Sequence, residues 1–122
     1  MKREIITIDE RSRLIVPIDS DKIWMSETEL AELFGVIGFT IRAVIKAVYK
    51  CGVLKELETK QYFHLMNGNR IDVYNMEVVA SLAFRLNTRG ASILSKWLIR
   101  RATAPARAAA PIIIQYKEGF IC

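Results

Sequence analysis

Residues 29–52 read ELAELFGVIGFTIRAVIKAVYKCG, and this stretch decides the expected fold. Apolar residues recur at three- and four-residue spacing on both sides of a glycine, which predicts two short amphipathic helices joined by a turn. A helix-turn-helix requires a small residue in the first helix, a glycine at the turn and an apolar residue that locks the second helix onto the first. Ala31, Gly35 and Ile41 occupy these three positions. The stretch therefore predicts a helix-turn-helix.

Capping residues mark the ends of both helices. Ser26 followed by Glu29 forms a capping box, so the first helix should begin at Glu27. The second helix is expected over about residues 39–50, and Gly52 is placed as its C-terminal glycine. This second helix is the expected recognition helix, the element that a helix-turn-helix lays in the major groove of DNA.

Further elements are expected on both sides of this pair. Two β-branched runs predict an N-terminal β-hairpin. Asn67, Gly68 and Asn69 predict the tight loop of a second hairpin, because asparagine and glycine tolerate the positive φ angles of such loops. Two more helices follow. The expected ranges are 4–9 and 13–18 for the first hairpin, 61–66 and 70–74 for the second, and 76–86 and 91–101 for the helices.

The expected fold class is α+β, a winged helix-turn-helix in which the second hairpin is the wing. A chain of 122 residues is long enough for one compact domain. Residues 1–24 would form the N-terminal hairpin, residues 25–101 the winged helix-turn-helix core with its two C-terminal helices, and residues 102–122 an Ala/Pro-rich arm with a terminal strand. That strand, at residues 112–116, would add either to the N-terminal hairpin or to a second copy of the chain.

The chain is basic, with a formal net charge of +5. Its positive excess is uneven. Residues 1–25 carry five basic and five acidic side chains, whereas residues 37–60 carry five basic against two acidic, and residues 76–103 five against one. A basic surface favours an anionic partner, and duplex DNA is the first candidate for a helix-turn-helix. We therefore expect the last two segments to form an anion-facing surface.

The expected recognition helix carries a basic stripe. Arg42, Lys46 and Lys50 recur every four residues and so share one face. Ala43, which lies beside them, would let the helix approach a DNA backbone closely. Arg42 is the candidate for a guanine contact, and the two lysines suit phosphates. The alternative interpretation is the solvated cationic face of an ordinary surface helix.

Three more residues complete the candidate DNA-binding set. Phe39 could touch a thymine methyl group, with Thr40 beside it at the start of the helix. Arg70, next to the loop of the second hairpin, could reach a phosphate or the minor groove; the alternative is a polar partner on the neighbouring strand. An exposed pair of Ile37 and Phe39 could equally form a protein-binding edge.

Two stretches resemble the RhuM-like proteins, a family associated with bacterial virulence and prophages. IWMSETELAELFGV, residues 23–36, is similar to that family's tryptophan-led entry to a helix-turn-helix. VYNMEVVASLAFRLNTRGA, residues 73–91, is similar to its later block. The resemblance covers roughly residues 14–101. It implies a DNA-binding protein of a bacterial chromosome or mobile element, without an established enzymatic activity for this region.

The chain departs from the family pattern at the start of the recognition helix. Just after the turn the family usually has polar residues, whereas Ile37, Gly38 and Phe39 stand here. Further on, where a serine, an arginine and a histidine are common, the chain has Arg42, Ala43 and Val44. These are the positions that would reach base edges.

The sequence lacks the patterns of common catalytic and nucleotide-binding sites. His64 is the only histidine, and it lies in an expected strand beside apolar residues, which argues against a Ser/His/Asp or Cys/His catalytic set. No glycine-rich nucleotide loop occurs, and no apolar run approaches the roughly 20 residues that cross a bilayer. We expect a non-catalytic, cytoplasmic protein without a metal, a cofactor or a membrane partner.

Two interpretations follow. The first is a DNA-binding protein, a transcriptional regulator or a mobile-element module, that contacts duplex DNA through helix 39–50 and the wing. The second is a non-catalytic interaction or dimerisation module that has lost base-specific reading and binds a protein through Ile37, Phe39 or the 112–116 strand. The two can coexist, because reading palindromic DNA usually needs a homodimer.

Overall fold

The structure is a computed structural model that describes residues 2–104, and most of the expected arm, including the 112–116 strand, lies outside this range. Within it the chain has a mixed α/β fold with five α-helices, one 3₁₀ turn and two small antiparallel sheets. In chain order the elements are β1 (Thr7–Ile8), β2 (Leu14–Ile15), η1 (Ser20–Lys22), β3 (Trp24–Ser26), α1 (Glu27–Phe34), α2 (Gly38–Cys51), α3 (Glu56–Thr59), β4 (Lys60–His64), β5 (Arg70–Asn75), α4 (Met76–Arg85) and α5 (Arg89–Thr103).

The helices α1 and α2 begin and end close to where the capping residues predict. The Ser26 hydroxyl accepts a hydrogen bond from the Glu29 backbone N–H, and the Glu29 carboxylate accepts one from the Ser26 N–H, which completes the capping box. Gly35 and Gly52 end the two helices at φ 67° and 83°, a left-handed conformation that glycine adopts without strain. Only the turn of residues 35–37 separates α1 from α2.

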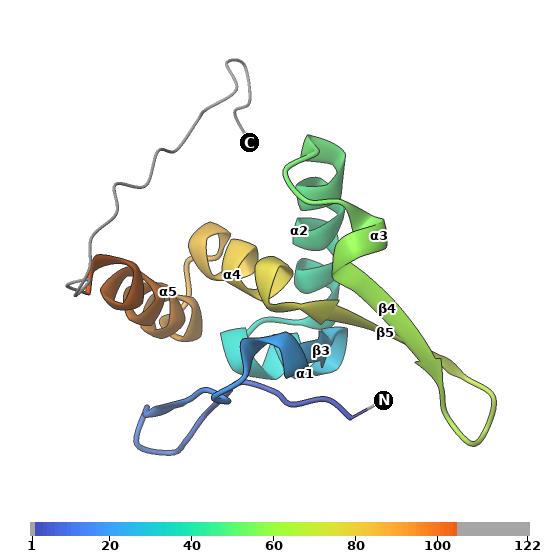
Figure 1. Ribbon diagram of the computed structural model, residues 1–122, viewed down its shortest axis with the longest axis horizontal. Coiled ribbons are helices and arrows are strands. Elements are labelled where there is room, and N and C mark those ends of the chain that lie inside the picture. The colour runs from blue at the N-terminus through green and yellow to red at the C-terminus, as the bar shows by residue number, and fades with distance from the viewer. Residues whose placement is uncertain (1, 105–122) are drawn as a thin grey trace.

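The larger sheet has the strand order β3-β5-β4, with both pairs antiparallel. β4 and β5 form the expected second hairpin, and Gly68 in its loop has φ 86°. Figure 1 shows this β4–β5 hairpin projecting beyond the helices. β3 lies outside the predicted elements, as does α3. Ser26 of β3 pairs with Val73 of β5, so the strand places the start of α1 directly beside the hairpin.

The N-terminal hairpin forms but is shorter than predicted, with two residues in each strand. Glu4, at the start of the predicted first strand, pairs elsewhere. Its N–H donates to the Lys22 carbonyl, and its own carbonyl accepts from the Trp24 N–H. At the turn, the Asp9 carboxylate accepts hydrogen bonds from the backbone N–H groups of Arg11 and Arg13.

The C-terminal helices α4 and α5 pack against the first pair. Asn75 caps α4, as expected. α5 begins two residues earlier than predicted, because Thr88 caps it and Gly90 lies inside its first turn. A Cβ atom on Gly90 would stand 2.2 Å from the Leu33 carbonyl oxygen, so only glycine allows α5 to approach α1 this closely. Figure 1 shows α4 between α2 and α5.

One hydrophobic cluster unites these elements. It takes residues from the N-terminal segment, β3, β5 and all four long helices, with Ile23, Phe34, Ile41, Leu82 and Leu94 fully buried. α2 contributes Ile41 and Ile45 to this cluster, and Val48 on the same face is also buried, so its outer face is left for other contacts.

Candidate nucleic-acid interface

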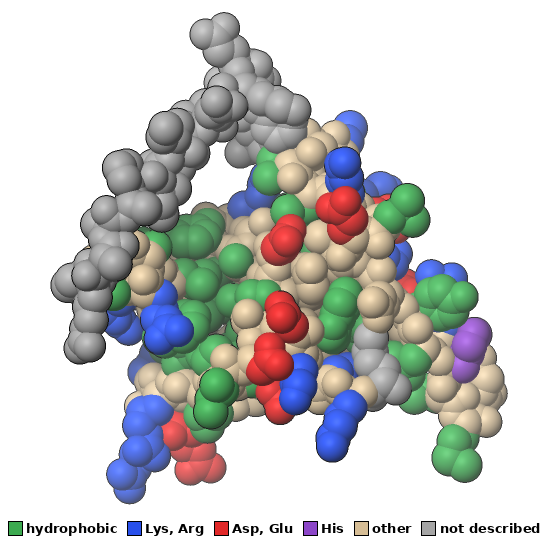
Figure 2. Space-filling model, viewed as in Figure 1, with side chains coloured by type: hydrophobic (Ala, Val, Ile, Leu, Met, Phe, Trp, Pro, Cys, Tyr) green, Lys and Arg blue, Asp and Glu red, His purple; other side chains and the backbone are tan. Residues whose placement is uncertain are grey.

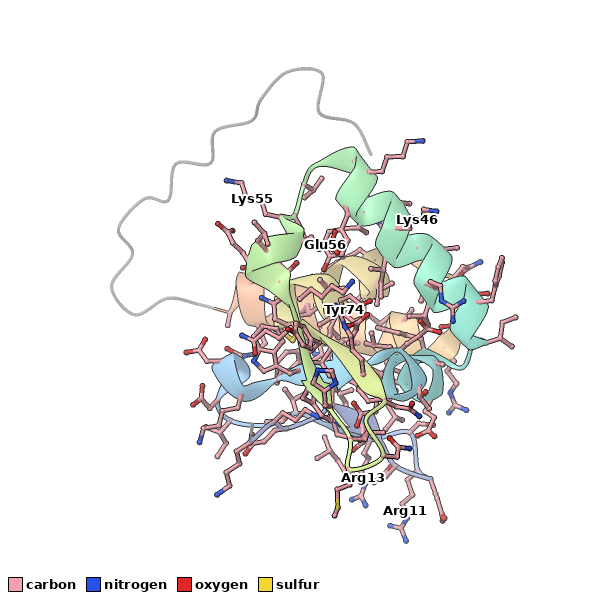
Figure 3. The ribbon with its side chains drawn as sticks, turned by 90° about the vertical axis from the view of Figure 1, so that its right-hand side faces the viewer. Arg11, Arg13, Lys46, Lys55, Glu56 and Tyr74 are labelled. Atoms are coloured by element: carbon pink, nitrogen blue, oxygen red, sulfur yellow. The ribbon has the colours of Figure 1, made fainter. Side chains whose placement is uncertain are left out.

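The outer face of α2 carries the residues of the candidate stripe. Arg42, Lys46 and Lys50 are exposed, with Ala43 among them, while Thr40 is half-buried at the edge. In Figure 3, Lys46 extends from α2 away from the sheet. The stripe therefore lies opposite the buried face of the helix, as its spacing predicts.

Arg42 has a partner that the sequence does not reveal. Its Nη2 and Nε atoms donate to the two carboxylate oxygens of Glu27, at 2.9 and 3.2 Å. The hydrogen bonds and the negative charge of Glu27 raise the pKa of the Arg42 guanidinium. The ion pair joins the first turn of α1 to the first turns of α2, and it directs Arg42 along the protein surface. Arg42 is therefore less free to reach a base than its position alone suggests.

Lys46 and Lys50 differ from Arg42 in this respect. Within residues 2–104 neither lysine forms an ion pair or a side-chain hydrogen bond. A lysine that has no internal partner keeps its charge available for an external anion, and a phosphate is a suitable one.

The start of α2 is apolar and exposed. Ile37 and Phe39 have 70% and 71% of their surface open to solvent. Ile37 occupies the N-cap position, where it provides no side-chain hydrogen bond to the first turn. The carboxylate of Glu27 lies close by, because a Cβ atom on Gly38 would stand 2.9 Å from its Oε1 atom. A carboxylate is favoured at this end of a helix by the helix dipole.

The β4–β5 hairpin presents a second set of residues. Tyr62 pairs with Asp72 and His64 with Arg70, so these four side chains share one face of the hairpin. The Arg70 guanidinium lies 4.2 Å from the centre of the Tyr62 ring and donates from Nε to the Asp72 carboxylate at 2.9 Å. Across the strands Arg70 therefore pairs with the polar His64 and packs on Tyr62, while its hydrogen-bonded carboxylate partner, Asp72, is on its own strand.

Contacts at the base of the hairpin join it to α2. The Thr59 hydroxyl donates to the Lys55 carbonyl at 2.8 Å, so it accepts from the Tyr49 hydroxyl of α2, 2.9 Å away. Burial raises the pKa of Tyr49.

Tyr74 occupies the same junction from β5. Its ring lies 5.9 Å from the Lys60 ammonium, and Figure 3 shows it between α2 and the hairpin. Burial raises its pKa, and the charge of Lys60 opposes the rise. Tyr74 pairs with Lys60 across the strands, and this pair lies two residues from the pair of Tyr62 and Asp72. Both pairs therefore lie on the hairpin face that also carries Arg70.

The second basic segment is divided between two helices, and only Arg85 of α4 approaches α2, with its Nη2 atom 4.0 Å from Cys51 Sγ at the end of that helix. α5, with Arg100 and Arg101, is separated from α2 by α4 (Figure 1). Figure 2 shows Lys and Arg side chains distributed over several parts of the visible face. Of the candidate residues, the structure brings those of α2 onto one face and Arg70 onto the adjoining hairpin.

Sequence reasoning missed Glu27 and Tyr62. Glu27 could not be linked to Arg42, because the pairing depends on how α1 packs on α2. Tyr62 had a signal. The Asn-Gly-Asn loop fixes the register of the hairpin, and that register sets Tyr62 diagonally beside Arg70.

Over residues 2–104, no helix is both long and apolar enough to cross a membrane, and no group of His, Cys, Asp and Glu side chains could hold a metal ion. Comparison of the chain with protein-family models, with curated proteins and with solved structures finds no match.

Proposed function

We propose that the chain is a non-catalytic winged helix-turn-helix protein that binds duplex DNA. In this proposal α1 and α2 form the helix-turn-helix, α2 lies in the major groove, and the β4–β5 hairpin is the wing on the flanking backbone. The resemblance of residues 14–101 to RhuM-like proteins supports the same class, a transcriptional regulator or a mobile-element DNA-binding module.

One observation carries the proposal. Lys46 and Lys50 lie on the outer face of a helix whose inner face is buried, and no acidic side chain of the described residues neutralises them. The small side chain of Ala43 lies among them, and it would let a DNA backbone approach the helix. Arg70 adds a cation on the adjoining hairpin, where its Nε atom is bound to Asp72 and about half of its side chain is exposed. Phosphate contacts of this kind position a protein on DNA, and base contacts then specify the sequence.

The roles within α2 follow from the contacts. Lys46 and Lys50 would bind phosphates. Phe39, exposed at the start of the helix, would touch a thymine methyl group. Arg42 can reach a guanine only after it exchanges its carboxylate partner, so base reading through Arg42 requires that the pair with Glu27 opens.

The experiment compares two double variants in fluorescence anisotropy titrations of a labelled random duplex. Lys46→Ala with Lys50→Ala removes the proposed phosphate contacts, and Lys96→Ala with Arg100→Ala removes the same charge from α5. The first variant should weaken binding and lower the salt dependence by about two units of log-log slope, since each contact contributes about 0.9. Equal affinities of the two variants would reject α2 as the DNA-binding helix.

A second candidate function is a protein-interaction or dimerisation module, and the exposed Ile37 and Phe39 side chains favour it. Adjacent large apolar side chains at the surface often mark an interface. Phe39→Asp would then change the oligomeric state in size-exclusion chromatography with light scattering, and leave DNA affinity unchanged. A monomer that is insensitive to Phe39→Asp would speak against this function.

A further inference from the structure

We infer that the β4–β5 hairpin is a minor-groove element, in which Arg70 enters a narrow, A·T-rich minor groove and Met66 at the tip acts as an apolar wedge between base pairs. The inference rests on the proposed function and deepens it, because it names the class of DNA, A·T-rich and deformable, that this chain would prefer.

The first support is the shape of the tip. The turn is held by hydrogen bonds from the Leu65 N–H to the Asn69 carbonyl at 2.8 Å and from the Asn69 N–H to the Asn67 side chain at 2.9 Å. Gly68 supplies the positive φ that the turn needs. The tip is therefore a defined turn that projects beyond the helices (Figure 1).

The second support is the apolar surface at that tip. The Met66 side chain is fully exposed, and Leu65 beside it is also exposed. Figure 2 shows hydrophobic side chains at the outer end of the projecting hairpin. Neither residue belongs to the hydrophobic core. Methionine and leucine are among the side chains that minor-groove proteins insert between base steps.

The third support is the way Arg70 is held. Its guanidinium rests on the exposed Tyr62 ring, and Asp72 binds its Nε atom, so the planar group is oriented before any ligand arrives. Roughly half of the Arg70 side chain remains open to solvent. An A·T-rich minor groove is narrow and strongly negative, and it attracts arginine side chains.

The arrangement fits DNA better than a protein partner. An apolar tip with an arginine a few residues away matches a groove that has phosphate walls and a stacked, apolar interior. Residues 60–75 carry two cations, Lys60 and Arg70, against one carboxylate, Asp72, although Lys60 is also paired with Glu56 of α3. The net charge of the hairpin is therefore weakly positive, as is that of the whole chain, and this sign favours DNA. Insertion of Met66 would unstack a base step and bend the duplex.

The test uses two duplexes of equal length, one A·T-rich with flexible TA steps and one G·C-rich, each labelled at both ends for energy transfer. Affinity is measured by anisotropy, and bending by the change in transfer efficiency on binding. The variants are Arg70→Lys, which keeps the charge but loses the planar group, and Met66→Ala. Leu57→Ala is the matched control, because Leu57 is equally exposed but lies on α3.

The wild type should prefer the A·T-rich duplex several-fold and should increase the energy transfer. Arg70→Lys should reduce that preference, and Met66→Ala should lose most of the bending with little change in the salt dependence. Leu57→Ala should behave as the wild type.

Two results would overturn the inference and leave the proposed function standing. In one, the wild type binds DNA without an A·T preference or without bending it; in the other, the preference and the bending are both unaltered in the hairpin variants. Absence of binding to either duplex would reject both. A Met66→Ala effect on oligomeric state instead of bending would assign the tip to a second copy of the chain and overturn the inference.

Discussion

Glu27 at the start of α1 accepts two hydrogen bonds from the guanidinium of Arg42 on α2, and its carboxylate lies over the first turn of α2 at Gly38. The N-terminal end of a helix attracts anions, and phosphates commonly bind there. In the DNA-binding proposal, Glu27 therefore occupies a position that suits a DNA phosphate and also engages the arginine best placed to read a base.

Replacement of Glu27 by Gln should increase DNA affinity several-fold, because it removes a negative charge from the proposed interface and releases Arg42. Anisotropy titration at constant salt measures the change. The control is Glu32→Gln, an equal change of charge on the same helix at an exposed residue. If the Glu27 and Glu32 variants gain affinity equally, the effect comes from net charge alone and the pairing with Arg42 has no specific role.

Gly90→Ala should destabilise the fold by about 1–3 kcal/mol or more, since overpacking forces a backbone shift. The added Cβ atom would meet the Leu33 carbonyl oxygen at 2.2 Å, where neither backbone has room to move without separating α5 from α1. Urea unfolding measures the loss. Gly38→Ala is the matched control, because its Cβ atom meets only the flexible end of Glu27. Similar midpoints for the two variants would contradict the close approach of α5 to α1.

The Glu29 carboxylate should contribute acid-sensitive stability. Burial alone raises its pKa, but an ion pair with Arg3 and hydrogen bonds from Ser26 hold the pKa below its ordinary value of 4.5. A lowered pKa in the folded state means that the contribution is present above about pH 4.5 and is lost as the pH falls through the folded pKa. Glu29→Gln should therefore be less stable than the wild type at neutral pH, with the difference shrinking in acid.

The free energy of unfolding of both proteins, measured from pH 7 to pH 3, tests this expectation. Glu32→Gln serves again as a control, since its carboxylate makes no ion pair within the described residues. A difference between Glu29→Gln and the wild type that stays constant across the whole pH range would show that the ionised carboxylate is not responsible.

Local signals in the sequence predict much of this fold. The capping box at Ser26, the cap at Asn75 and the glycine at Gly52 each act through residues within one helical turn, so they could be recognised without knowledge of the tertiary structure. The Asn67 to Asn69 loop is local in the same sense.

The features that were missed depend on long-range packing. β3 is only three residues long, and its partner β5 lies more than forty residues away, so no periodic pattern marks it. Gly90 suggests a helix break in the sequence, yet it lies within α5. Only glycine fits at this position, because α5 approaches the backbone of α1 closely there. For the candidate site, spacing predicted the exposed stripe of α2, whereas the pairing of Arg42 with Glu27 depends on how two helices pack.

Binding of duplex DNA is tested most directly by anisotropy of a labelled random duplex, titrated with the purified full chain at several salt concentrations. Phosphate contacts from Lys46 and Lys50 predict a log-log salt slope of at least about 2, at roughly 0.9 for each phosphate contact. Failure to bind even at low salt, or a slope near zero, would contradict a DNA-binding surface on α2 and the hairpin.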